Sequence, residues 1–204
     1  VVAPTTPHDA KGCMIASIED NNPVIFLEHR MLYKNEGIVP SEKFSNQIGK
    51  GRVLVPGNDI SIIAVSHMVV EAVRAAELLK EVGVTAEIID PVWMAPLDTE
   101  LIFESVKKTK NILVVDHSWV TAGFSAEIVA LIAENDKKVP GKVKFARMGY
   151  ENVPCPTTKP LEDIFYPNAL KIAKKAYEQL GNDSNTWNPN YAESKEICEF
   201  RGPF

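Results

Sequence analysis

Apolar residues recur along the chain in patterns that predict alternating strands and helices. Residues 60–65 form an almost unbroken, β-branched run, which is typical of a strand buried on both faces. From residue 68 to 82 the apolar positions recur every three or four residues, which predicts an amphipathic helix. We expect the side chain of Ser66 to cap this helix and Gly83 to end it. With a second strand at residues 85–90, this stretch forms one predicted βαβ unit.

The same alternation continues on both sides of this unit. Further strands are expected at residues 24–27, 51–55, 111–115 and 143–148. Further helices are expected at residues 7–20, 99–109 and 125–135 and from 167 to 180. Strands that alternate with helices are the signature of a mostly parallel sheet covered on both faces. The sequence therefore predicts a three-layer α/β/α fold.

Some side chains carry more specific expectations. The apolar residues on one face of the helix at residues 7–20 are expected to be buried, and they are Ala10, Met14, Ile15 and Ile18. Asp98 is expected to cap the helix at residues 99–109. Within that helix Glu104 and Lys108 are four residues apart, which is the spacing of a supporting ion pair.

Composition narrows the class of protein. Hydrophobic residues make up 45% of the 204, which is enough for a sizeable core. The net charge of −5 and the lack of a basic cluster argue against nucleic acid as a partner. No apolar run approaches the ~18 residues of a membrane span, which argues against a membrane partner. Three widely separated cysteines (Cys13, Cys155 and Cys198) indicate reduced thiols in a cytosol-like compartment.

Polar residues follow several predicted strands, and ligands of open α/β sheets bind beyond the carboxyl ends of strands. The candidates are Ser66-His67, Asp90 and Asp116-His117-Ser118. Consecutive residues point apart and there is no G-x-S-x-G elbow, so a hydrolase triad is a weaker interpretation than loop anchoring. The histidines lack i, i+4 partners, which argues against a zinc site; they are His8, His29, His67 and His117.

The end of the first predicted helix offers another possibility. Residues 17–22 close this helix, and Pro23 follows. The last carbonyl groups of a helix lack internal partners and carry partial negative charge. With Asp20 beside them, they could hold a cation through oxygen atoms. Water or backbone turns could satisfy the same carbonyls, and spacing alone favours that second interpretation.

An ordered set of motifs carries a family resemblance. They are residues 6–12 (TPHDAKG), 18–28 (IEDNNPVIFLE), 66–69 (SHMV), 89–91 (IDP) with 96–98 (PLD), 123–128 (GFSAEI), and 153–156 (VPCP) with 161–162 (LE). In this order they resemble the beta subunit of the thiamine-diphosphate-dependent, decarboxylating component of 2-oxo acid dehydrogenase complexes. The resemblance covers about residues 1–180. Beta subunits of the pyruvate and branched-chain enzymes are nearest in kind, and transketolase is more distant.

The resemblance implies a division of the chain. Residues 1–47 would be the end of a pyrimidine-binding domain with its linker, 48–181 a transketolase C-terminal domain and 182–204 a tail. The front part of such a subunit would be absent from this chain. It would carry the residues that contact the thiamine, so no catalytic or cofactor-binding residue is expected here.

The resemblance also implies an activity. The complete enzyme would be an oxidoreductase that decarboxylates a 2-oxo acid, with pyruvate as the first expectation, and acylates lipoamide. It would use thiamine diphosphate and magnesium, which the alpha subunit would help to hold. The 204-residue chain alone would be inactive.

A metal site and partners follow from the same resemblance. Some family members hold potassium, mostly through backbone oxygens, at the stretch that matches Ser17, Ile18, Asp20 and Asn22. The expected partners are the alpha subunit, a second beta subunit and the dihydrolipoyl acyltransferase core, in an enzyme built as a heterotetramer. The expected compartment is the bacterial cytoplasm, or the mitochondrial matrix or plastid in a eukaryote. A transketolase-type fragment and a non-catalytic α/β assembly module stay open as alternatives.

Overall fold

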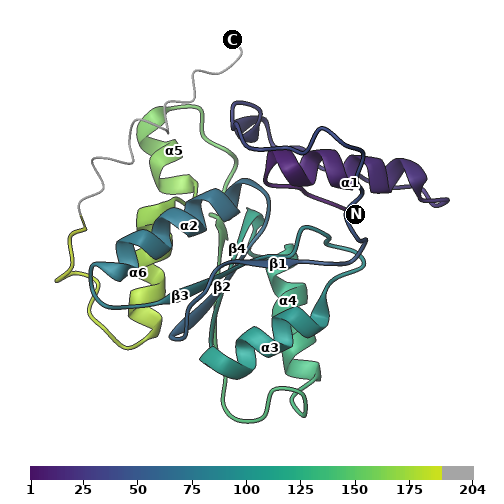
Figure 1. Ribbon diagram of the computed structural model, residues 1–204. Coiled ribbons are helices and arrows are strands. Elements are labelled where there is room, and N and C mark those ends of the chain that lie inside the picture. The colour runs from purple at the N-terminus through teal and green to yellow at the C-terminus, as the bar shows by residue number, and fades with distance from the viewer. Residues whose placement is uncertain (190–204) are drawn as a thin grey trace.

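A five-stranded sheet lies between two layers of helices in residues 1–189, the part of the chain that this computed structural model describes (Figure 1). The strands are β1 (Arg52–Val55), β2 (Ile60–Ala64), β3 (Ala86–Asp90), β4 (Asn111–Trp119) and β5 (Lys144–Tyr150). Their order in the sheet is β1-β3-β2-β4-β5. All neighbouring strands are parallel except the edge strand β1, which is antiparallel to β3. The prediction of a mostly parallel sheet is confirmed.

Two helices cover each face of the sheet. Helices α2 (His67–Lys80) and α6 (Ala169–Gln179) pack on one face, and α3 (Thr99–Thr109) and α4 (Phe124–Glu134) pack on the other (Figure 1). Every residue of β2 and β3 is buried, as expected for strands in the middle layer. None of the helices within residues 1–189 is long and apolar enough to cross a membrane.

The N-terminal segment lies beside the sheet. It contains α1 (Pro7–Glu19) and a short 3-10 helix, η1 (Arg30–Leu32) (Figure 1). Val2 forms isolated bridges with Phe26 and Trp93, and the terminal amino group of Val1 donates to the carbonyl oxygen of Ala95 at 2.7 Å. A small apolar cluster around Trp93 and Cys13 therefore joins this segment to the loop that follows β3.

The predicted buried face of α1 is wrong. The buried residues are Asp9, Gly12, Cys13 and Ala16, whereas Met14 is 40% exposed and Ile18 is 75% exposed. The body of the protein packs against the side of small residues, where a Cβ on Gly12 would stand 2.2 Å from Asn46 Oδ1. The strand expected at residues 24–27 is also absent, because only Phe26 forms a bridge and its neighbours Ile25 and Leu27 are exposed.

Helix ends and side-chain pairs give a mixed result. Asp98 caps α3 by accepting a hydrogen bond from Leu101 N at 3.3 Å, and Gly83 follows α2 with φ +73°, as predicted. Ser66 makes no side-chain cap, because its backbone adopts φ 54° and ψ −130°. The predicted Glu104–Lys108 pair is wrong as well, since Lys108 pairs with Glu87 of β3 instead.

One α-helix of the described residues was not predicted, and neither was the short helix η1. Helix α5 (Lys159–Phe165) lies in the proline-rich stretch, where Pro160 occupies the first turn, a position at which the missing N–H costs nothing. Trp187, in the predicted tail, is buried and packs 5.0 Å from the ring of Tyr177. Residues 190–204 of that tail lie outside the described residues.

Candidate functional site

Residues at the carboxyl ends of the strands separate into two clusters. Asp90, the last residue of β3, lies with charged side chains from α1 and β1. His67 and His117 lie with a third histidine, His29, from the N-terminal segment. The strand ends predicted this gathering of polar residues. Neither the separation into two clusters nor the contribution of His29 follows from the sequence pattern.

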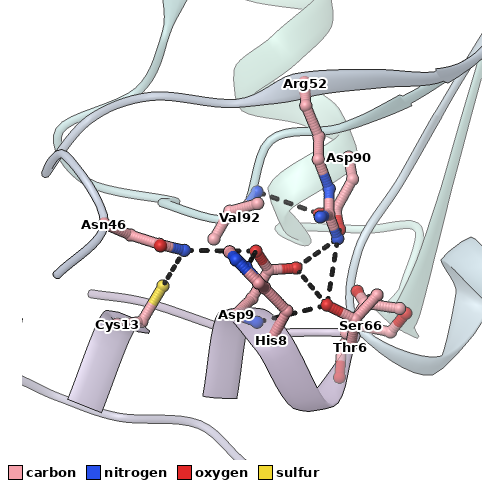
Figure 2. Close-up of polar contacts among 10 residues, drawn as sticks. Thr6, His8, Asp9, Cys13, Asn46, Arg52, Ser66, Asp90 and Val92 are labelled. Atoms are coloured by element: carbon pink, nitrogen blue, oxygen red, sulfur yellow. Dashed lines mark hydrogen bonds and ion pairs between the residues drawn. The ribbon is translucent and has the colours of Figure 1, made fainter. Parts of the chain in front are cut away.

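The first cluster connects α1 to the edge of the sheet (Figure 2). Asp9, in the first turn of α1, accepts hydrogen bonds from Thr6 Oγ1 at 2.7 Å and from Asn46 Nδ2 at 3.1 Å. The guanidinium group of Arg52 lies between Asp9 and Asp90 and forms ion pairs with both carboxylates. These contacts join residues on both sides of the predicted division at 47–48.

Asp90 is held in an environment that opposes its charge. Burial raises the pKa of Asp90 to about 6, although Arg52 and a hydrogen bond from Val92 N at 3.0 Å both favour the carboxylate. The desolvation of a fully buried carboxyl group therefore outweighs the attraction of its partners. Because the charged groups pair with one another in the interior, we interpret this cluster as a structural connection.

The second cluster, which we call the histidine cluster, consists of His29, His67 and His117. His67 is the first residue of α2, His117 lies in the last part of β4, and His29 precedes η1. Strands β2 and β4 are parallel neighbours, with Ala64 paired to Val115. The segments that follow this pair therefore place His67 beside His117, and the N-terminal segment adds His29.

The three imidazole rings contact one another. Nδ1 of His117 and Nε2 of His29 are 2.9 Å apart, so one of these nitrogens donates a hydrogen bond to the other. The ring of His67 lies 5.0 Å from that of His29 and 5.3 Å from that of His117, and it is stacked on both. His29 also accepts a hydrogen bond through Nδ1 from Met31 N at 3.3 Å.

The surroundings keep these histidines neutral. Burial lowers the pKa of His67 to about 4, helped by the neighbouring His29 and Arg74. Burial lowers the pKa of His117 to about 3, helped by the other two histidines, and it also lowers the pKa of His29. At neutral pH each imidazole therefore keeps an available lone pair on one of its two ring nitrogens.

Aromatic side chains and a pocket flank the histidine cluster. The ring of Tyr150, at the end of β5, lies 5.5 Å from that of His117, and Tyr166, which follows α5, lies 6.4 Å from it. Burial, with Asp116 and Cys155 nearby, raises the pKa of Tyr150 to about 12, so its hydroxyl stays protonated. An open pocket of about 210 Å³, lined in part by His29 and Glu28, reaches the cluster from the side of the N-terminal segment.

The structure does not assemble a hydrolase triad from Asp116, His117 and Ser118. The hydroxyl of Ser118 donates directly to Asp116 Oδ2 at 2.5 Å, and His117 turns to His29. The carboxylate and the hydroxyl therefore bypass the imidazole that would have to relay between them.

The cation site expected at the end of α1 has the right kind of oxygen atoms. Within residues 1–189 no backbone N–H donates to the carbonyls of Ser17 or Ile18. The backbone N–H and the side-chain amide of Asn22 both donate to Asp20 Oδ1 at 2.8 Å, and these bonds hold the pKa of Asp20 below its ordinary value. The stretch thus presents carbonyl oxygens beside an ionised carboxylate.

The described cluster of potential metal ligands does not suit magnesium. Magnesium prefers oxygen ligands, mainly carboxylates and water. Among residues 1–189, the histidine cluster is the only group of three or more His, Cys, Asp or Glu side chains close enough to hold a metal ion. Three imidazoles suit a different class of metal.

Comparison with known proteins gives a consistent set of relatives. Residues 49–172 match the family described as "Transketolase, C-terminal domain". The acetoin:2,6-dichlorophenolindophenol oxidoreductase subunit beta of Bacillus subtilis is 35% identical over 181 residues, which cover 88% of this chain and 52% of the relative. The pyruvate dehydrogenase E1 component subunit beta of the same organism is 38% identical over 183 residues, or 87% and 55%. The chain thus spans about half the length of these relatives.

Solved structures show the same fold. A split-gene transketolase, described as an inactive beta4 tetramer, superposes with a TM-score of 0.72 at 22% identity, covering 88% of this chain and 56% of that one. A transketolase mutant from Pichia stipitis superposes with a TM-score of 0.58 at 17% identity, covering 88% and 25%. At these identities the likeness concerns the architecture alone.

Proposed function

This chain belongs to the family of the transketolase C-terminal domain, and from that premise we propose that it is the C-terminal part of the beta subunit of a 2-oxo acid dehydrogenase. The proposal rests on the sequence identity of 35–39% between this chain and beta subunits whose names specify acetoin or pyruvate. We propose pyruvate as the first substrate to test, with oxidative decarboxylation and acylation of lipoamide as the reaction.

In this proposal the described residues serve the assembly of the subunits into the complete enzyme. Half of the twelve exposed large apolar side chains fall within residues 1–47, a quarter of the described chain. Among them, Ile18 is 75% exposed and Ile38 is 95% exposed. Such a concentration of exposed apolar side chains is typical of surfaces that contact further protein. The proposed partners are the rest of the beta subunit, the alpha subunit, a second beta subunit and the acyltransferase core.

The cofactor belongs to the complete enzyme in this proposal. Thiamine diphosphate would supply the electron sink for decarboxylation, held with magnesium by other polypeptide. The residues described above hold the scaffold together through the Asp9–Arg52–Asp90 cluster and present the assembly surface. The chain alone is therefore expected to be inactive.

Activity of the reconstituted complex tests the proposal. The chain would be expressed together with a polypeptide that supplies the rest of a beta subunit and with an alpha-type subunit. Reduction of 2,6-dichlorophenolindophenol would then be followed with pyruvate, branched-chain 2-oxo acids and acetoin, in the presence of thiamine diphosphate and Mg²⁺. Dye reduction by the complex with a 2-oxo acid, and none by the chain alone, is the expected result.

Three outcomes would count against the proposal. Turnover by the 204-residue chain alone would overturn the assignment of the reacting centre to other polypeptide. Transfer of a two-carbon unit between sugar phosphates, without dye reduction, would favour the transketolase alternative. No activity in the complex with any of these substrates would favour a non-catalytic assembly module.

We also propose that Ser17, Ile18, Asp20 and Asn22 hold potassium in the complete enzyme. The support is the pair of carbonyls, those of Ser17 and Ile18, that accept no backbone N–H from residues 1–189 and lie beside the ionised Asp20. Replacing K⁺ by Na⁺ should lower the melting temperature of the reconstituted complex, and Asp20→Asn should abolish this difference. An equal melting temperature in the two salts would contradict the site.

A further inference from the structure

We propose that the histidine cluster is a binding site for a transition-metal ion, with Zn²⁺ the main candidate, coordinated by His29, His67 and His117. One nitrogen from each ring can be chosen such that all three lie within 4.8 Å of one another. The site is separate from the proposed potassium site and from the thiamine cofactor, and it does not depend on the proposed function. The absence of an i, i+4 pattern does not exclude it, because the ligands converge from three elements.

The three rings can approach a tetrahedral site through small adjustments. A zinc ion with Zn–N distances of about 2.0–2.1 Å places its nitrogen ligands about 3.3 Å apart. His117 Nδ1 and His29 Nε2 are 2.9 Å apart and must open slightly, and separations of up to 4.8 Å within the cluster must contract. Rotations of the imidazole rings about their side-chain bonds cover such adjustments.

One nitrogen of the cluster lacks a partner that a metal ion could replace. A histidine binds a metal through the lone pair of a neutral imidazole. Nδ1 of His67 is buried without a hydrogen-bond partner among the described residues, which is an unfavourable state that a metal ion would relieve.

Binding has a small and identifiable cost at His29. Coordination through Nε2 requires the proton of the neutral ring to sit on Nδ1, which now accepts a hydrogen bond from Met31 N. That bond is long, at 3.3 Å, so little stabilisation is lost when it breaks. The bond between His29 and His117 is replaced by two bonds to the metal.

The donor set selects the class of metal. Imidazole suits Zn²⁺, Cu²⁺ and Ni²⁺, whereas Mg²⁺ and Ca²⁺ require several oxygen ligands, which this cluster does not offer. Three protein ligands leave a fourth tetrahedral position for water or a small molecule. An open pocket of about 210 Å³ borders the cluster at His29.

Metal titration of the 204-residue chain tests the proposal. After treatment with a chelator, the chain would be titrated with Zn²⁺ by calorimetry at pH 7.5, and with Co²⁺ while its visible absorption is recorded. We expect about one ion per chain and the absorption bands of four- or five-coordinate cobalt. X-ray absorption at the zinc edge of the unmodified chain should show imidazole nitrogen as the main protein ligand, a readout that needs no variant.

The four histidines of the chain supply matched variants. Loss of a group that merely supports a ligand typically weakens binding about 10–100-fold, so His29→Gln and His117→Gln should each weaken it at least about 100-fold. His8→Gln is the control, because His8 stacks on Phe44 and is not part of the cluster. Circular dichroism would confirm that each variant is folded.

The outcomes are distinct. Stoichiometric binding that is lost in the cluster variants and kept in His8→Gln supports the site. No binding to the unmodified chain, equal binding by all variants, or a zinc edge dominated by sulfur or carboxylate ligands would each overturn it. Activity of the reconstituted dehydrogenase does not enter this test, so the proposed function can fail while the metal site stands, and the reverse.

Discussion

Lys108 of helix α3 forms an ion pair with Glu87 of strand β3, whose side chain is 5% exposed. Glu87 lies within a strand of which every residue is buried. Burying a carboxylate alone is costly, and a cation that reaches it from the covering helix offsets most of that cost. The pair therefore explains how a charged residue is accommodated in the middle layer of the fold.

Replacing Lys108 should reveal the free-energy cost of burying the Glu87 carboxylate without a partner. Lys108→Met leaves Glu87 without its cation, so we expect the free energy of unfolding to fall by about 2 kcal/mol or more. Lys107→Met is the matched control, because Lys107 pairs with Glu104 at the surface and such a pair contributes less than about 1 kcal/mol. Urea denaturation measures both variants, and equal effects would show that Glu87 does not depend on Lys108.

The raised pKa of Asp90 should make part of the stability depend on pH. The pKa rises from 3.8 to about 6 on folding, so between these values the folded chain binds a proton that the unfolded chain has released. The stability from this group is therefore present below about pH 4 and is lost as the pH rises through 6.

Asp90→Asn removes this titration. The difference in the free energy of unfolding, unmodified chain minus variant, should fall by about 2 kcal/mol between pH 4 and pH 7. Urea denaturation of both proteins at each pH measures it, and the subtraction cancels the other titrating groups. A difference that does not change with pH would mean that Asp90 titrates normally in the folded chain.

Ser66 should be replaceable by glycine with a gain in stability. Its φ of 54° with ψ −130° is costly for a residue with a Cβ, typically about 1–3 kcal/mol, while glycine adopts it freely. After the entropic cost of glycine in the unfolded chain, Ser66→Gly should stabilise the fold by about 1 kcal/mol.

Ser66→Ala is the control for that substitution. It keeps the Cβ and removes only the hydroxyl, which makes no cap. Its melting temperature in scanning calorimetry should therefore match that of the unmodified chain. A clear loss of stability in Ser66→Ala would indicate that the hydroxyl caps α2 after all.

The elements that sequence patterns predict well are those whose signals agree locally. Helix α3 begins and ends as predicted, at Thr99 and Thr109, because Asp98 caps its start and the charged and apolar positions alternate with the helical period. Helix α5 was missed because its prolines suggested a loop, although Pro160 in a first turn is compatible with a helix.

The candidate sites depend on information that local patterns do not contain. His67 and His117 meet only because β2 and β4 are neighbours in the sheet, and His29 reaches them from a segment 88 residues before His117. The sequence placed two of the three at strand ends, but strand order is a property of the whole fold. The predicted buried face of α1 was wrong for a related reason. Periodicity identifies an apolar stripe on a helix, but it does not say which part of the protein, or which other polypeptide, covers that stripe.

The last prediction concerns the exposed apolar stripe of α1, which consists of Met14 and Ile18. Ile18 contributes little to the isolated chain because it is 75% exposed, so Ile18→Asp should change the free energy of unfolding of this chain by less than about 0.5 kcal/mol. If the stripe contacts other subunits, the same substitution buries a carboxylate in an apolar interface and should weaken assembly at least about tenfold, measured by analytical ultracentrifugation of the reconstituted complex. Ile164→Asp on α5, at 65% exposure, is the matched control and should leave assembly unchanged. Assembly that tolerates Ile18→Asp as well as Ile164→Asp would remove α1 from the proposed interface.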